Sequence, residues 1–283
     1  MRYLDTCRVQ HTPPRLPDYS PVIIHDQTIQ DGAAWSTMIA RARSEWPDPQ
    51  LDALIERTVA DIKRTVGSKR AAFAWSGTKD SLVLAHIARL AGIHRCVLAI
   101  TDLEYPEFLR WVTDCMPDGL TVISTGQNLQ WLQQYPRMLF PQGAHWLRHW
   151  HTVVQQRAHE RYYKDQKLGM LLLGHRREGH YSYGPFKELT WRDRSGIIRY
   201  TPLVDWSPAA MLSLIHRERI PMPPCYGWPR GLQVGPGPWP ARQGTTSTCH
   251  GFHEVWQIDP DLVRSAAPQL PEAARWLDLT GRS

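Results

Sequence analysis

The sequence is poor in cysteine and carries no cysteine motif. Its 283 residues include five cysteines, and no two of them form a CxxC pair. Zinc ribbons and iron–sulfur clusters need closely spaced cysteine ligands, and disulfide scaffolds need many cysteines in a short chain. These classes are disfavoured, and most of the cysteines are predicted to be free thiols: Cys7, Cys96, Cys115, Cys225 and Cys249.

Long apolar runs are also absent. No stretch approaches the roughly 20 apolar residues that a membrane-spanning helix needs, and Met1 to Asp5 has no apolar signal core. We therefore expect a cytoplasmic protein without a membrane partner. Hydrophobic residues make up 42% of the chain and charged residues 21%, as expected for a globular protein with a buried core.

The chain has no block of lysine and arginine that reads as a nucleic-acid-binding tail. Its basic residues are scattered, and they give a formal net charge of +6 and a pI near 9.2. Such a surface favours anionic partners. Nucleotides and nucleic acids are both anionic partners. Solubility alone is a third explanation of the excess of basic residues.

Composition divides the chain into three parts. Residues 1–47 are rich in proline and polar residues, which predicts an irregular N-terminal arm with a short helix around Trp35–Ala42. Residues 48–220 are predicted to form a nucleotide-binding domain. Residues 221–283 form a lid or tail region, because 221–244 are rich in proline, glycine and tryptophan.

Apolar strands and helical stripes alternate through the central part. This alternation predicts an α/β fold, with a doubly wound, mostly parallel five-stranded sheet and helices on both faces. Asp48 and Ser207 each precede a proline and are predicted as helix N-caps. The predicted strands lie at 70–75, 96–101, 121–124, 170–173 and 197–200, and the helices at 51–66, 82–90, 144–167, 208–215 and 271–279.

The segment after the first strand combines the groups that a phosphate chain needs. Phosphate binding uses amides at a helix N-terminus, a glycine that lets the backbone approach, and a cation. Gly77 allows the approach, Lys79 supplies the cation, and Ser76 and Ser81 supply hydroxyl donors. Asp80 is predicted to cap the helix or to bind Mg²⁺. A polar strand-to-helix turn without a ligand is the alternative.

The segment Ser76-Gly77-Thr78-Lys79-Asp80-Ser81 resembles the Ser-Gly-Gly-Lys-Asp-Ser loop of PP-loop ATP pyrophosphatases, an adenine nucleotide alpha-hydrolase-like family. Thr78 stands where that family has its second glycine. The resemblance implies that these six residues bind the phosphates of an adenine nucleotide, with Lys79 and Asp80 in catalytic roles.

Three later segments resemble the PAPS (phosphoadenosine phosphosulfate) reductase branch of that family, and they occur in the family's order. They are residues 101–107, with Asp102 and Glu104, residues 174–178, with Gly174 and Arg176, and residues 200–207. The resemblance adds Asp102, Glu104, Gly174 and Arg176 to the nucleotide site and gives Arg176 a catalytic role. Solvated loop charges are the alternative for Arg176 and its neighbour Arg177.

Cys249 is the candidate nucleophile in the tail. PAPS reductases use a cysteine in a late Glu-Cys-Gly-Leu-His segment, which Thr248-Cys249-His250-Gly251-Phe252-His253 resembles imperfectly. His250, His253 and Arg242 are predicted to favour the thiolate. An unreactive, half-buried thiol and a weak metal site with the two histidines are the alternatives.

The leading hypothesis is an enzyme that uses ATP and Mg²⁺ to adenylate an acceptor and releases pyrophosphate. The acceptor is unidentified, and a sulfur-containing compound or a nucleic acid is among the candidates. The second hypothesis is a reductase of PAPS or adenylyl sulfate, with Cys249 as nucleophile and thioredoxin as partner. The third is a nucleotide-binding protein without turnover. Dimers are common in the resembled family, so the resemblance also suggests a homodimer.

Overall fold

The computed structural model describes residues 28–177, 188–242 and 244–282. Most of the predicted N-terminal arm, with Cys7, lies outside these residues, and so does Glu178. Every helix in the described parts is too short or too polar to span a bilayer.

Six strands form one sheet in the order β3-β2-β1-β4-β6-β5. The first five in this order run parallel, and β5 pairs antiparallel with β6. The prediction of a mostly parallel sheet is confirmed, with one strand more than expected, since β5 is a short and largely exposed edge strand. The strands are β1 (Ala71–Ala74), β2 (Cys96–Ile100), β3 (Leu120–Ser124), β4 (Met170–Leu172), β5 (Thr190–Arg192) and β6 (Ile198–Tyr200).

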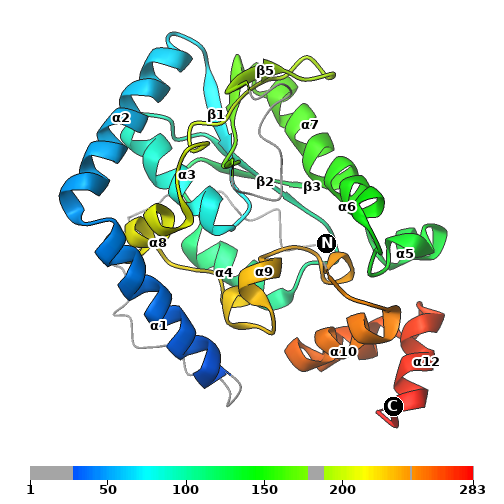
Figure 1. Ribbon diagram of the computed structural model, residues 1–283. Helices are drawn as coiled ribbons and strands as arrows, with labels where there is room; N and C mark the ends of the chain where they lie inside the picture. Colours follow the sequence, from blue (N-terminus) through cyan, green and yellow to red (C-terminus); the bar gives the residue numbers. More distant parts are fainter. Residues whose placement is uncertain (1–27, 178–187, 243, 283) are drawn as a thin grey trace.

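Helices cover both faces of the sheet. Successive strand residues point to opposite sides, so neighbouring residues pack against helices on different faces. Phe73 packs with the helices α2 (Asp48–Val66), α3 (Lys79–Leu90) and α8 (Pro208–Arg217) in one core cluster. Its neighbour Ala72 packs in a second cluster with residues of α7. Figure 1 shows α7 across the sheet from α2, α3 and α8. Residues of α4 (Pro106–Cys115) also pack in the first cluster. α7 (Arg157–Asp165) ends a continuous helical run that begins with α6 (Ala144–His151) and a π-helical turn (Thr152–Gln156), and Trp150, Val153 and Val154 of that run pack in the first cluster.

The helix predicted around Trp35–Ala42 is longer in the structure, where α1 runs from Thr28 to Glu45. It packs on α8, and the Ser213 hydroxyl donates to the Trp46 carbonyl at 2.9 Å. Two further helix starts were predicted. Ser207 caps α8 as expected. The prediction for Asp48 is wrong, because Pro47 holds the N-cap position and Asp48 pairs with Arg43 at 2.7 Å.

The C-terminal part is more helical than predicted, and α10 and α12 lie together at one end of the molecule (Figure 1). The helix predicted at 271–279 is confirmed as α12. Short helical turns occupy the region that was predicted as a lid. The remaining elements are α5 (Leu129–Gln134), 3₁₀ turns at Pro136–Met138, Pro224–Gly227 and Trp239–Ala241, α9 (Gly231–Val234), α10 (Thr248–Ile258), α11 (Pro260–Ala266) and α12 (Pro271–Thr280).

Strand order places the candidate site. From β1 the chain proceeds to β2 and β3 on one side, then returns to β4 on the other side of β1. Ligands of open α/β sheets bind at the carboxyl ends of strands where the order reverses in this way. Residues 75–81 follow β1 and residues 173–177 follow β4, so both predicted segments lie at this switch point.

Candidate functional site

Hydroxyl groups shape the loop between β1 and α3. Thr78 is the N-cap of α3, and its Oγ1 accepts a hydrogen bond from the Ser81 amide at 3.3 Å. The Ser81 Oγ accepts in turn from the Ser76 amide at 3.1 Å. The cap predicted for Asp80 is therefore wrong, because Asp80 lies inside the first turn and the residue before Lys79 takes that position. The hydroxyls of Ser76, Thr78 and Ser81 form hydrogen bonds within the loop, and their contact with a nucleotide stays a prediction.

The amides of this loop divide into bonded and unbonded groups. The Lys79 amide donates to the Tyr226 hydroxyl at 2.7 Å. Among the described residues, the amides of Gly77, Thr78 and Asp80 have no hydrogen-bond partner. Unpaired amides at a helix N-terminus form an anion-binding site, since the N–H groups and the helix dipole both attract negative charge.

Two cationic side chains meet one carboxylate beside these amides. The Asp80 Oδ1 lies 3.2 Å from the Arg176 Nε and 3.8 Å from the Lys79 Nζ. Among the described residues, the Asp80 Oδ1 has no hydrogen-bond partner, so both contacts are purely electrostatic. The Arg176 side chain is 5% exposed, whereas that of Lys79 is 27% exposed. Two cations against one anion leave the cluster with a positive charge, and Lys79 can reach a ligand from solvent.

Two glycines allow close packing around the loop, Gly77 against a side chain and Gly174 against the backbone. Gly77 has φ +73°, and a Cβ there would lie 2.8 Å from a ring carbon of Phe108. A Cβ at Gly174 would lie 3.0 Å from the backbone oxygen of Asp80. The segment after β4 therefore packs directly on the first turn of α3, as a site built from both segments requires.

Asp102 and Glu104, predicted to contact the nucleotide, accept hydrogen bonds from nearby residues of β3 and of the loop after β2. The buried Glu104 Oε1 accepts from the Thr101 amide and hydroxyl, both at 3.1 Å. Burial raises the pKa of Glu104 to about 7, against the lowering effect of these hydrogen bonds. The Asp102 carboxylate accepts from Ser124 at 3.3 Å. Both side chains shape the loop after β2, and a nucleotide contact stays a prediction.

Tyr226 is the contact that sequence reasoning missed. It lies in the 3₁₀ turn Pro224–Gly227, within the stretch predicted as a lid. The same stretch packs on the loop after β2, where the Tyr105 and Trp228 rings lie 4.5 Å apart and the Trp239 amide donates to the Leu103 carbonyl at 3.0 Å. No motif marks Tyr226. Its position in a stretch rich in proline and tryptophan was the only available signal.

A family model described as the phosphoadenosine phosphosulfate reductase domain matches residues 70–228, more than half of the chain. The chain belongs to this family. The match begins at β1 and includes the loop 76–81, Arg176 and Tyr226. Curated proteins gave no match to the sequence of this PAPS reductase family member.

Solved structures similar to this family member share little sequence with it. The PAPS reductase of Candida auris, in a phosphate complex, is 16% identical, with a TM-score of 0.48 over 68% of this chain and 95% of that one. The NMN synthetase of Francisella tularensis is 15% identical, with a TM-score of 0.44 over 82% and 96%. The NH3-dependent NAD synthetase of Campylobacter jejuni subsp. jejuni is 10% identical, with a TM-score of 0.43 over 80% and 96%.

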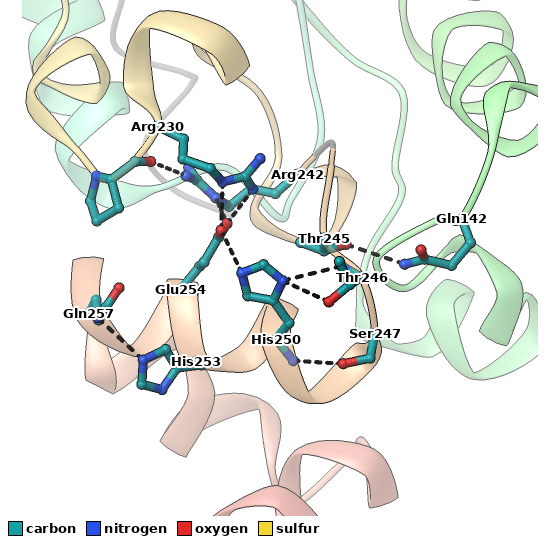
Figure 2. Close-up of polar contacts among 11 residues, drawn as sticks. Gln142, Arg230, Arg242, Thr245, Thr246, Ser247, His250, His253, Glu254 and Gln257 are labelled. Atoms are coloured by element: carbon teal, nitrogen blue, oxygen red, sulfur yellow. Dashed lines mark hydrogen bonds and ion pairs between the residues drawn. The ribbon is translucent and has the colours of Figure 1, made fainter.

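Cys249 lies beyond the part that matches the PAPS reductase family model. It is exposed in the first turn of α10. In Figure 2 the groups predicted to favour its thiolate are bound elsewhere: His250 and Arg242 contact Glu254 at 3.1 and 3.0 Å, and His253 contacts Gln257 at 3.3 Å. In the described parts of the chain, no three metal-binding side chains come together. The metal alternative for Cys249 has no support there.

The other described cysteines, Cys96, Cys115 and Cys225, are free as predicted. Burial raises the pKa of the Cys96 and Cys225 thiols to about 12, so both stay protonated and unreactive at neutral pH. Cys249 is therefore the exposed thiol among the cysteines that the structure describes.

Proposed function

We propose that the protein binds ATP on the loop 76–81 and transfers the AMP group to an acceptor, releasing pyrophosphate. The observation that carries the proposal is the convergence of three unpaired amides with Lys79 and Arg176 at the switch point of the sheet. A nucleophilic atom of the acceptor would attack the α-phosphorus, and the bond from that phosphorus to the α,β-bridging oxygen would break. The departing pyrophosphate carries the charge that the site must stabilise.

The protein groups suit that charge. The amides of Gly77, Thr78 and Asp80 would donate to phosphate oxygens, and the partly exposed Lys79 ammonium would approach the leaving group. Donors that are fixed in advance stabilise developing charge without reorganisation. Arg176 is buried against Asp80, so its charge and its planar guanidinium group would together position the loop.

Asp80 as a Mg²⁺ ligand stays a prediction. Its Oδ1 is already shared by Arg176 and Lys79, and a third cation at that oxygen would be repelled by both. Mg²⁺ in nucleotide sites is commonly held by one or two carboxylates and by the phosphates themselves. Mg²⁺ as cofactor stays a prediction from the resemblance.

The test is release of AMP and pyrophosphate from ATP, in a buffer with Mg²⁺ and a panel of sulfur-containing, small-molecule and nucleic-acid acceptors. Lys79→Met should reduce pyrophosphate release at least a hundredfold, because it removes the cation that solvent can reach. Lys63→Met is the matched control on the exposed face of α2, and it should leave the rate unchanged. Equal rates in the two variants would rule out the role of Lys79. ATP binding without release for any acceptor would favour a nucleotide-binding protein without turnover.

A reductase is the second candidate, and the exposure of Cys249 in the first turn of α10 favours it. The Cys249 sulfur would attack the sulfur of PAPS or adenylyl sulfate, displace the nucleotide and form a thiosulfonate. Thioredoxin would then release sulfite and leave a disulfide. Cys249→Ser should abolish sulfite formation and leave pyrophosphate release intact, so the variant separates the two candidates.

A further inference from the structure

The segment between Asp118 and Glu160 carries charge of one sign. Residues 119–159 contain no aspartate or glutamate, but they contain three arginines and four histidines. The three arginines, Arg137, Arg148 and Arg157, are all exposed. Among the described residues none of them forms an ion pair. A surface of unpaired cations without neighbouring carboxylates in its own sequence attracts polyanions.

Aromatic rings lie among these cations. Tyr135 is 49% exposed, and its ring lies 5.1 Å from that of Trp131. The Arg137 guanidinium lies 5.6 Å from the centre of the half-buried Trp146 ring. Exposed rings are energetically costly in water, but they provide flat faces on which unstacked bases can lie.

The buried Trp150 side chain holds the Trp131 ring in place. Trp131 contacts Trp150 edge-on, with ring centres 5.1 Å apart. Trp150 is buried, and its indole N–H donates to the Met138 carbonyl at 2.9 Å. This bond ties α6 to the turn that follows α5. A rigid platform loses little conformational entropy when a ligand binds.

The surface adjoins the carboxyl edge of the sheet. α5 begins five residues after the end of β3, and Figure 1 shows α5 beside the first part of the α6–α7 run. The connection between β3 and α5 contacts the loop after β2, since the Asp102 amide donates to the Gln127 carbonyl at 3.0 Å. A ligand on α5 and α6 therefore lies next to the edge that carries the candidate nucleotide site.

We propose that Trp131, Tyr135, Arg137 and Trp146 form a binding surface for an unpaired polynucleotide strand, with Arg148, two residues along α6 from Trp146, as a further cation. The arginines contact phosphates and the rings stack on bases, the two features that single-strand binding surfaces combine. A duplex hides its base faces, so it would use only the charges. Rings and guanidinium groups recognise features that RNA and DNA share, so the sugar is not part of the proposal. The proposal does not depend on the chemistry at the nucleotide site.

Fluorescence anisotropy with a labelled single-stranded 20-nucleotide DNA, and with RNA of the same sequence, tests the surface in the full chain. Arg137→Gln/Arg148→Gln should weaken binding at least tenfold at 50 mM NaCl. It should also reduce the slope of log affinity against log salt, by about 0.7 for each phosphate contact that is lost. Arg57→Gln/Arg64→Gln on α2 makes the same change in net charge on another face and should change affinity less than twofold.

Tyr135→Ala removes an exposed ring, so the fold should tolerate it, and it should weaken single-strand binding about tenfold by loss of stacking. Duplex of the same sequence should bind more weakly than the single strand. Absence of single-strand binding at 50 mM NaCl, equal losses in the two double variants, or tighter binding of duplex would each overturn the proposal. Lys79→Met should bind the strand like the unmodified protein, which separates this surface from the nucleotide site.

Discussion

The Tyr226 hydroxyl accepts a hydrogen bond from the Lys79 amide at 2.7 Å, although the two residues are 147 positions apart. A residue of the C-terminal stretch thus accepts a hydrogen bond from one of the amides at the N-terminus of α3. The neighbouring amides of Gly77, Thr78 and Asp80 have no partner among the described residues. Tyr226 and a phosphate oxygen would therefore compete for the same donor.

Tyr226→Phe removes this competing oxygen. A single hydrogen bond contributes about 0.5 to 1.5 kcal/mol, so we expect ATP to bind roughly twofold to tenfold more tightly to the variant. Isothermal titration calorimetry with ATP measures the change. Tyr163→Phe on α7 is the control, since its hydroxyl contacts the Ile198 amide instead. Weaker ATP binding in Tyr226→Phe would mean that the hydroxyl contacts the nucleotide itself.

Gly174→Ala tests the close approach of the two segments. The added Cβ would lie 3.0 Å from the Asp80 backbone oxygen, so the segment after β4 must shift away from α3. We expect a loss of about 1 to 3 kcal/mol in the free energy of unfolding, together with weaker ATP binding. Gly237→Ala is the matched control, because nothing lies within 4 Å of its Cβ position. Urea unfolding of both variants gives the comparison, and equal losses would contradict the packing argument.

The adjacent arginines Arg176 and Arg177 differ in burial. Arg176 is 5% exposed and contacts Asp80, whereas Arg177 pairs with Asp205 at 2.8 Å on the surface. Lysine keeps the charge but loses the planar fork of donors. Arg176→Lys should therefore weaken ATP binding about tenfold. Arg177→Lys should change it less than twofold, because exposed ion pairs contribute little. Titration calorimetry would refute the assignment if the two variants lost affinity equally.

Glu104 should make stability depend on pH. Burial raises its pKa from 4.5 to about 7 in the folded protein. Between these values the folded state holds a proton that the unfolded state releases, so this stabilising contribution is present below pH 4.5 and is lost as the pH rises through 7. The loss should reach about 3 kcal/mol. Urea unfolding between pH 4.5 and 8 should show a smaller decline for Glu104→Gln than for Glu56→Gln, an exposed control on α2.

Glu254 should respond to pH in the opposite direction. Burial alone would raise its pKa, but hydrogen bonds and charges from Arg230 and Arg242 outweigh burial and lower it. Its stabilising contacts are therefore present above the pKa of the unfolded state and are lost as the pH falls through the folded value. Hydrogen exchange of α10 amides should accelerate in Glu254→Gln at pH 7. Unchanged exchange there would show that the contacts in Figure 2 do not hold α10 in place.

Local signals in the sequence were sufficient for most of the sheet. The strand β1 was predicted because a short apolar run ends at a glycine turn, and Ser207 was recognised as a cap because a proline follows it. The strand β5 was missed, because three exposed residues at an edge carry no apolar pattern. Asp80 was predicted as a helix cap from its residue type. The helix begins at Lys79, so Thr78 is the N-cap.

The sequence by itself determined that a glycine-containing loop follows a buried strand in a parallel sheet, since periodicity and turn chemistry act over a few neighbouring residues. Only the tertiary structure decided that Arg176 would lie on Asp80 and that Tyr226 would cover the Lys79 amide. These contacts join residues that are far apart in the chain. They depend on the order of the strands and on the path of the C-terminal stretch, which local patterns do not encode.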